Sequence, residues 1–417
     1  MKIIGNADTL NIIRRTLNKI DTRLVDHGER VSYTFYHLLK MEGSYSEKQI
    51  FNLCIVALFH DIGAYKTEEI DRLVQFESSE TWRHSIYGYI FFKDLSPLSK
   101  YADVVLYHHL NCNRFHHVES EWLKTANLLH LADRIDVATL NSIDEIEAFL
   151  MTYCLGKQFT QESIELFCKA NREFDFMEKI KNHTYKAQLD DFLLTGDFSK
   201  QEIHNYLKMV AYLIDFRSEQ TVAHTITTVR ISVETAKYLG LNSDEIAKIY
   251  YGSLLHDIGK VTTPLEVLEK AGKLTDSEMS KMQCHVAVTN EILEGYIDDS
   301  IRKIAARHHE KIDGTGYPLG LKEDELTLSE QIVAVTDIMS ALTGRRSYKE
   351  GFSKEKTISI LIHMRDHHKL SPVVVDTVVL HYDEIMKNAN HASEKLIQIF
   401  HNIRTEYSVL FEKYQAI

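Results

Sequence analysis

Apolar residues recur along this chain mainly at intervals of three and four, the spacing of one face of an α-helix. Behind Ser199, for example, Ile203, Leu207 and Val210 follow at this spacing. The predicted helix starts carry capping-box pairs, in which two side chains three positions apart satisfy free backbone N–H groups. These pairs are Ser46 with Gln49, Ser199 with Glu202, Asn242 with Glu245 and Thr275 with Glu278. Runs of alternating β-branched residues, which would indicate strands, are not found. We therefore expect an all-α protein.

One order of histidines and aspartates occurs twice. Each half carries a histidine, a His-Asp step after an apolar run, a lone histidine, an adjacent histidine pair and a later aspartate. In the first half these residues are His27, His60, Asp61, His84, His108, His109 and Asp133, and in the second they are His224, His256, Asp257, His285, His308, His309 and Asp337. Matching residues are about 200 positions apart throughout, which indicates a duplication. We expect two tandem helical domains, residues 1–196 and 197–417.

The net charge limits the class of partner. The chain carries a net charge of −12, and this field repels polyanions, so a protein that grips long DNA or RNA is excluded. A small anionic ligand stays compatible, because lysine and arginine can dominate inside one cleft.

The cysteines and apolar runs indicate the compartment. The five cysteines do not form a C-x-x-C pair, which is typical of a reducing compartment. The first residues lack the apolar core of a secretion signal, and the apolar runs are shorter than the roughly 18 residues of a membrane helix. We expect a cytoplasmic protein that does not enter a membrane.

Histidine pairs and His-Asp steps supply what a two-metal centre needs: neutral imidazoles and a carboxylate that can bridge two ions. In the second half the pair His308-His309 opens a segment that ends in Gly316-Tyr317-Pro318. A lone histidine is more often a core or surface residue, but an ordered set is far more specific. With its His-Asp step and late aspartate, this half resembles the HD-GYP family of metal-dependent cyclic-dinucleotide phosphodiesterases. The first half resembles a degenerate tandem copy.

The resemblance implies a centre of two divalent transition-metal ions in residues 197–417. Asp257 matches the catalytic carboxylate that bridges the ions. The implied metal ligands are His224, His256, Asp257, His285, His308, His309 and Asp337. Mixed nitrogen and oxygen donors suit iron or manganese, whereas structural zinc often takes thiolates.

The resemblance also implies residues that bind the substrate. Lys260 matches a catalytic lysine on the scissile phosphate, and Arg346 and Lys349 match phosphate-binding cations. Gly316, Tyr317 and Pro318 belong to a loop that borders the dinucleotide. The alternatives are a solvated lysine at a helix end for Lys260 and an exposed basic turn for the other two cations.

Two residues depart from the family pattern. Gln220 stands where some members carry a glutamate for a third metal ion, which favours two ions here. Ser340 stands where an acidic residue is common, and this leaves open which group supports the metal ligands.

The first half keeps the ligand pattern and lacks the substrate-contacting parts. Ala64 occupies the position of Lys260, and His108-His109 is not followed by a Gly-Tyr-Pro segment. We expect a regulatory domain whose second set, His27, His60, Asp61, His84, His108, His109 and Asp133, is a candidate metal site. The alternative is a domain kept for packing, whose histidines are incidental.

Together these features predict a phosphodiesterase that opens a cyclic dinucleotide, cyclic di-GMP first, to a linear dinucleotide or mononucleotides. The alternatives are an enzyme specific for cyclic GMP-AMP, a general HD-type phosphohydrolase of mononucleotides, and a cyclic-dinucleotide receptor with slow turnover. A signalling-protein partner and a homodimer are compatible with the family.

Overall fold

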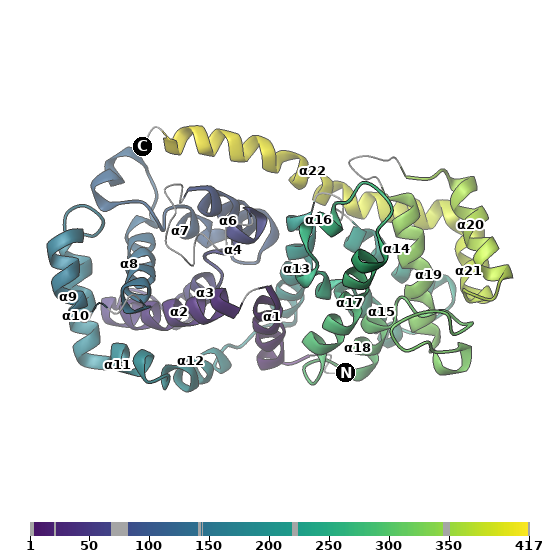
Figure 1. The fold of residues 1–417 in the computed structure, drawn as a ribbon, viewed down its shortest axis with the longest axis horizontal. Coiled ribbons are helices and arrows are strands. Elements are labelled where there is room, and N and C mark those ends of the chain that lie inside the picture. Colours follow the sequence, from purple (N-terminus) through teal and green to yellow (C-terminus); the bar gives the residue numbers. More distant parts are fainter. Residues whose placement is uncertain are drawn as a thin grey trace. The chain divides into compact units, whose positions relative to one another are not determined.

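The computed structural model describes residues 4–20, 22–67, 82–140, 143, 145–218, 224–344 and 351–415. Over these residues the secondary structure is helical, with two isolated β-bridges, Leu155 with Phe159 and Asp313 with Lys322. The all-α prediction is confirmed (Figure 1). Within the described ranges, every helix is too short or too polar to cross a membrane.

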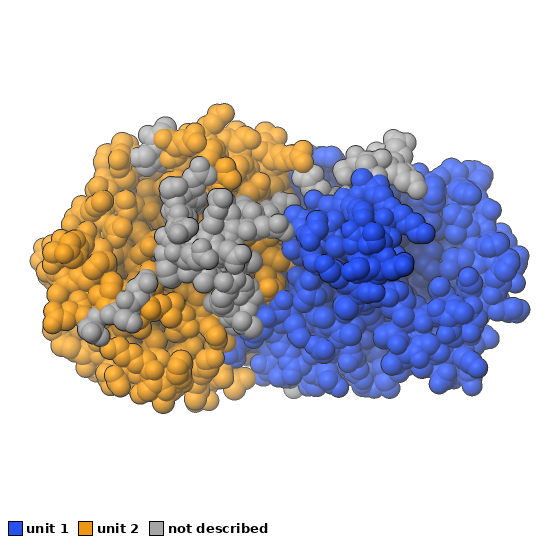
Figure 2. All heavy atoms as spheres, viewed as in Figure 1, with its two compact units in different colours: residues 1–19, 206–402 blue, residues 20–205, 403–417 orange. Residues whose placement is uncertain are grey.

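The chain forms two compact units, coloured separately in Figure 2. Unit 1 comprises Met1–Lys19 and Tyr206–Asn402, and unit 2 comprises Ile20–Asn205 and Ile403–Ile417. The helices of unit 1 are α1 (Asn6–Ile20), α14 (His224–Tyr238), α15 (Ser243–Leu255), η4 (Ile258–Thr262), α16 (Leu265–Leu268), α17 (Asp276–Leu293), α18 (Asp299–Ala306), η5 (Glu323–Glu325), α19 (Leu328–Thr343), α20 (Lys354–Asp366) and α21 (Pro372–Leu380).

Unit 2 is built in the same way from short and medium helices. They are α2 (Thr22–Glu42), α3 (Glu47–Leu58), α4 (Ile62–Thr67), α6 (Trp82–Leu95), η1 (Ser99–Tyr101), α7 (Ala102–Leu106), η2 (Cys112–His117), α8 (Leu123–Leu140), α9 (Ile146–Phe149), the π-helical turn η3 (Leu150–Cys154), α10 (Gln161–Phe174), α11 (Phe176–Lys181) and α12 (Tyr185–Leu194). Helices α13 (Lys200–Arg217) and α22 (Tyr382–Gln415) run from one unit into the other.

The first helix packs with unit 1. The guanidinium of Arg15 donates to the backbone carbonyls of Glu291 and Glu294 at 2.8 and 2.9 Å, at the end of α17. Lys19 pairs with the carboxylate of Glu291 at 2.5 Å. These contacts place α1 in the unit that contains the second half of the sequence.

The end of α22 packs with unit 2. The ring of Tyr407 stacks on Tyr87 with centroids 4.4 Å apart, and Tyr414 stacks on Trp82 at 4.6 Å. Each compact unit therefore includes a helical segment that is distant in sequence from the rest of that unit. The domain ranges 1–196 and 197–417 stay a prediction.

The predicted helix starts satisfy their backbone donors. Ser46 and Thr275 form complete capping boxes at the starts of α3 and α17. Asn242 accepts the N–H groups of Asp244 and Glu245 at the start of α15. Because most of α3 and the last turn of α15 are buried, the His-Asp step that follows each helix lies in the interior of its unit.

The core of unit 1 fixes the helices that carry the later ligands. Ile231 of α14, Ile249 of α15 and Val335 of α19 are fully buried in one cluster with residues of α21 and α22. Val335 lies two positions before Asp337, so the packing of α19 also positions this aspartate.

Candidate metal centres

The predicted ligands of unit 1 converge from five helices. They are His224 at the start of α14, His256 and Asp257 after α15, His285 in α17, His308 and His309 after α18, and Asp337 in α19. All of them are buried or half-buried.

The carboxylate of Asp257 divides the histidines into two groups. Its Oδ2 lies 3.2 Å from Nε2 of His256 and 3.7 Å from Nε2 of His224. Its Oδ1 lies 3.5 Å from Nε2 of His285 and 3.8 Å from Nε2 of His308. A carboxylate that bridges two ions requires this arrangement, in which each oxygen faces a separate set of nitrogen donors.

Asp337 completes both groups. Its Oδ1 lies 3.0 Å from Nε2 of His224 and 3.5 Å from Nε2 of His256, and its Oδ2 lies 3.8 Å from Nδ1 of His309. The cluster therefore contains two carboxylates among five imidazoles.

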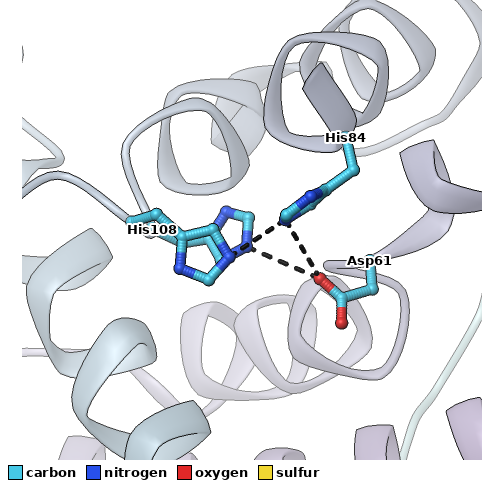
Figure 3. Close-up of side chains that lie close together, drawn as sticks. Asp61, His84 and His108 are labelled. Carbon is cyan, nitrogen blue, oxygen red and sulfur yellow. Dashed lines mark hydrogen bonds and ion pairs between the residues drawn. The ribbon is translucent and has the colours of Figure 1, made fainter. Parts of the chain in front are cut away.

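Unit 2 repeats this geometry around Asp61. Its Oδ2 lies 3.4 Å from Nε2 of His60 and 3.7 Å from Nε2 of His27. Its Oδ1 lies 3.6 Å from Nε2 of both His84 and His108, and Figure 3 shows these two rings converging on that oxygen.

Asp133 occupies the position in unit 2 that Asp337 occupies in unit 1. Its Oδ1 lies 3.3 Å from Nε2 of His27, and its Oδ2 lies 3.9 Å from Nδ1 of His109. The structure thus brings both predicted ligand sets together, each within its own unit.

The donor atoms of both clusters fit a metal ion. Nε2 of His256 and Oδ1 of Asp257 are buried and lack a hydrogen-bond partner among the described residues, as do Nε2 of His60 and Oδ1 of Asp61. Nδ1 of each of these histidines instead donates at 2.7 Å to the backbone carbonyl three positions earlier. Because a carbonyl only accepts, Nδ1 of each ring carries a proton, and Nε2 is the nitrogen that faces the cluster and would coordinate a metal ion.

Burial sets the charge of the imidazoles. Burial lowers the pKa of His285 to about 3 and that of His309 to about 4, so both rings are neutral at pH 7, the form that binds metals. For His256, burial acts against protonation, but Asp257 and Asp337 together raise its pKa to about 10. The two carboxylates therefore attract positive charge to this place in the cluster.

Lys260 lies beside the carboxylate of Asp257. Its Nζ donates to Oδ2 of Asp257 at 2.6 Å, and its side chain is 16% exposed. Burial alone would raise the pKa of Asp257, but the charges of His256 and Lys260 hold it well below its usual range. In unit 2 the corresponding residue, Ala64, is fully buried.

A glycine two positions after each aspartate has a structural role that the sequence analysis does not predict. A Cβ on Gly259 would lie 2.0 Å from the carbonyl oxygen of His285, and a Cβ on Gly63 would lie 1.9 Å from that of His84. The turn after each His-Asp step must therefore approach the backbone of the next ligand closely. The repetition of this glycine in both halves was the available signal.

The Gly-Tyr-Pro loop contacts the histidine pair. The ring of Tyr317 lies 4.8 Å from the ring of His309, and its backbone N–H donates to the carbonyl of His309 at 3.2 Å. A Cβ on Gly316 would lie 2.4 Å from Cα of Glu310. The buried carboxylate of Glu310, also missed from the sequence, accepts two backbone N–H groups of the loop at 2.7 and 3.0 Å.

Unit 2 places two further side chains at its cluster. The ring of His130 lies 5.5 Å from that of His109, and Nε of Arg134 lies 3.8 Å from Oδ2 of Asp133. The predicted phosphate-binding residues of the second half, Arg346 and Lys349, lie outside the described residues.

Residues 24–138 and residues 208–374 each match an HD domain family, HD in the first case and HD_5 in the second. The chain is a tandem HD-domain protein. The first HD domain lies in unit 2 and contains the cluster around Asp61, and the second lies in unit 1 and contains the cluster around Asp257. The predicted tandem of HD domains is confirmed.

Relatives of the tandem HD protein include enzymes of known specificity. The 3'3'-cGAMP-specific phosphodiesterase 1 of Vibrio cholerae is 29% identical over 388 residues, which cover 88% of this chain and 89% of that protein. A cyclic di-GMP phosphodiesterase of Thermotoga maritima is 36% identical over 208 residues, 49% of this chain and 54% of that protein. A solved structure described as the cyclic GMP-AMP specific phosphodiesterase V-cGAP3 of V. cholerae covers 90% of this chain and 97% of that one, with a TM-score of 0.53 and 18% identity, and supports the fold alone.

Proposed function

We propose that the HD domain of unit 1 is a metal-dependent phosphodiesterase that hydrolyses a cyclic dinucleotide, with 3'3'-cGAMP as its substrate. The observation that carries this proposal is the carboxylate of Asp257, whose two oxygens face separate histidine groups. The sequence alone placed cyclic di-GMP first. The similarity over most of both chains to a cGAMP-specific enzyme favours the alternative substrate, cyclic GMP-AMP.

The chemistry follows from the donor set. Two divalent ions held by the seven ligands of unit 1 would polarise the phosphoryl oxygens and lower the pKa of an attacking water. Iron or manganese suits these nitrogen and oxygen donors. Asp257 would be the ligand that the two ions share. Lys260, beside it, supplies a positive charge near the phosphate, where negative charge develops in the transition state.

For the HD domain of unit 2 we propose metal binding without efficient cleavage. The proposed ligands are His27, His60, Asp61, His84, His108, His109 and Asp133. This domain has Ala64 in place of Lys260 and lacks the Gly-Tyr-Pro segment, so the groups that would contact a substrate phosphate are missing from its sequence. A regulatory role follows.

Cyclic di-GMP is the second candidate substrate, because relatives over the second half of the chain, such as the T. maritima protein, are cyclic di-GMP phosphodiesterases. A receptor that binds either dinucleotide and turns it over slowly is the second candidate function.

The test uses the full chain loaded with Mn²⁺ and offered 3'3'-cGAMP or cyclic di-GMP separately, with products resolved by chromatography. We expect faster linearisation of 3'3'-cGAMP, and loss of turnover in Asp257→Asn. The matched variant of unit 2, Asp61→Asn, should still turn over substrate. If the fully loaded protein cleaves neither dinucleotide, or if Asp257→Asn cleaves at the wild-type rate, the proposal fails.

A further inference from the structure

The two clusters differ in the group that supports their first histidine. In unit 2, Nδ1 of His27 lies 2.8 Å from Oδ2 of Asp136, whose side chain is 1% exposed. Arg30 holds the same carboxylate, with Nε 2.5 Å from Oδ1 and Nη2 3.0 Å from Oδ2. The imidazole of His27 is therefore backed by a buried carboxylate in a fixed orientation.

In unit 1 the corresponding residue is Ser340. Its Oγ lies 3.1 Å from Nδ1 of His224 and donates to the backbone carbonyl of the same residue at 3.3 Å. In the tautomer that leaves Nε2 free for a metal ion, Oγ accepts from Nδ1–H while its own proton goes to the carbonyl. Both histidines thus present Nε2 to their clusters, but His224 is backed by a neutral hydroxyl.

This difference acts on metal affinity. A carboxylate that accepts Nδ1–H makes Nε2 a stronger donor and fixes the ring, and loss of such a partner commonly reduces metal affinity about 10–100-fold. Arg30 offsets part of the charge of Asp136, yet the carboxylate stays in direct contact with the imidazole. A neutral hydroxyl has no comparable effect on the basicity of the ring.

The cations around the bridging carboxylates act in the same direction. In unit 1, Nζ of Lys260 lies 2.6 Å from Oδ2 of Asp257 and competes with an ion for that oxygen. In unit 2 the position belongs to Ala64. Nε of Arg134 lies 3.8 Å from Oδ2 of Asp133 in unit 2, and this longer ion pair is weaker than the pair of Lys260 with Asp257.

We infer that the cluster of unit 2 holds its divalent ions about 10–100-fold more tightly than the cluster of unit 1, with Asp136 and Ser340 as the positioning residues that set the difference. The inference rests on the proposed function, in which both clusters are metal centres. As free metal falls, unit 1 loses its ions first, and unit 2 retains them.

The experiment measures bound Mn²⁺ per full-length chain by elemental analysis after equilibration in buffers of graded free Mn²⁺. Asp257→Asn reports the affinity of unit 2, and Asp61→Asn reports that of unit 1. Half-occupancy should occur at about 10–100-fold lower free Mn²⁺ in Asp257→Asn than in Asp61→Asn.

The reciprocal exchange identifies the residues. In the Asp61→Asn protein, the second substitution Ser340→Asp should tighten Mn²⁺ binding by unit 1. Misfolding would not produce such a gain. In the Asp257→Asn protein, the second substitution Asp136→Asn should weaken Mn²⁺ binding by unit 2. The control substitution Asp191→Asn, at an exposed position, should leave that binding unchanged. Equal half-occupancy in the two reference variants, or no tightening by Ser340→Asp, overturns the inference alone. If neither reference variant binds Mn²⁺ at saturation, the proposed metal centres fail and the inference falls with them.

Discussion

Nζ of Lys260 donates to Oδ2 of Asp257 at 2.6 Å, so the carboxylate that faces both histidine groups also carries a cation. The same oxygen faces His224 and His256. The second cluster, which has Ala64 at this position, repeats the ligands without that lysine. The two clusters therefore differ at this position in one positive charge beside the central carboxylate.

Replacing this lysine should affect turnover more than binding. Because its contact with phosphate strengthens as charge develops, we expect Lys260→Ala to lower kcat on 3'3'-cGAMP by about 10–100-fold, the equivalent of about 1–3 kcal/mol for one charged hydrogen bond. Steady-state kinetics with bound metal measured in parallel checks this. The exposed Lys281→Ala is the matched control. Wild-type kcat in Lys260→Ala at full metal content would contradict the assignment.

The glycine after the His-Asp step should be intolerant of a methyl group. In Gly259→Ala the added Cβ meets the backbone of His285, which must shift at a cost of about 1–3 kcal/mol. We expect a lower melting temperature for unit 1, by about 2–4 °C per kcal/mol for a domain of this size, and reduced Mn²⁺ retention. Gly272→Ala is the matched control, because its Cβ would meet no described atom within 4 Å. Equal stability and metal content in the two variants would show that the close approach is unimportant.

The buried Glu310 should shape the loop rather than the metal centre. Its carboxylate accepts two loop N–H groups, and each donor left unpaired costs about 1–3 kcal/mol. We expect Glu310→Ala to disorder the loop around Tyr317, and so to raise KM for 3'3'-cGAMP about tenfold or more while bound Mn²⁺ is retained. Glu266→Ala, an exposed glutamate, controls for loss of charge. Loss of Mn²⁺ from Glu310→Ala would instead assign the residue to the metal centre.

His37 should make unit 2 sensitive to acid. Burial, with a smaller effect of Lys179, lowers its pKa to about 4, and both ring nitrogens lack a hydrogen-bond partner among the described residues. An unfolded histidine titrates near about 6.5, so between about pH 6.5 and pH 4 the unfolded state binds more protons. The free energy of unfolding therefore falls as the pH drops through this window.

Replacing His37 with phenylalanine should remove this contribution. His37→Phe should lose less stability than the wild type between pH 7.5 and pH 4.5, by at most about 3 kcal/mol. Thermal unfolding at several pH values measures the difference, and the exposed His401→Gln should leave the pH dependence unchanged. An identical pH dependence in His37→Phe and the wild type would show that the pKa of His37 in the folded chain equals that of an unfolded histidine.

The clustering of the predicted metal ligands could be expected from the sequence because each of these residues lies on or beside a helix whose apolar face is visible in the pattern. The last turn of α15 and most of α19 are buried, so His256 and Asp337 lie in the interior of unit 1. The role of Gly259 was hidden, because its constraint comes from the backbone of a helix more than twenty residues away. Ser340 was recognised only as a departure, since the identity of its partner, Nδ1 of His224, depends on a ring orientation that sequence spacing does not specify.

The packing of the terminal helices could not be predicted either. The amphipathic pattern of α1 shows that one face is buried, but does not say against which domain, and Arg15 finds its acceptors on α17. Arg346 and Lys349 stay predictions.

The stacking of Tyr414 on Trp82 and of Tyr407 on Tyr87 has a consequence for biosynthesis. Synthesis of Trp82 precedes all of α13 to α21, yet its aromatic partner belongs to a segment translated after them. The rings of Trp82 and Tyr87 therefore lack these two stacking partners until the end of α22 has been translated.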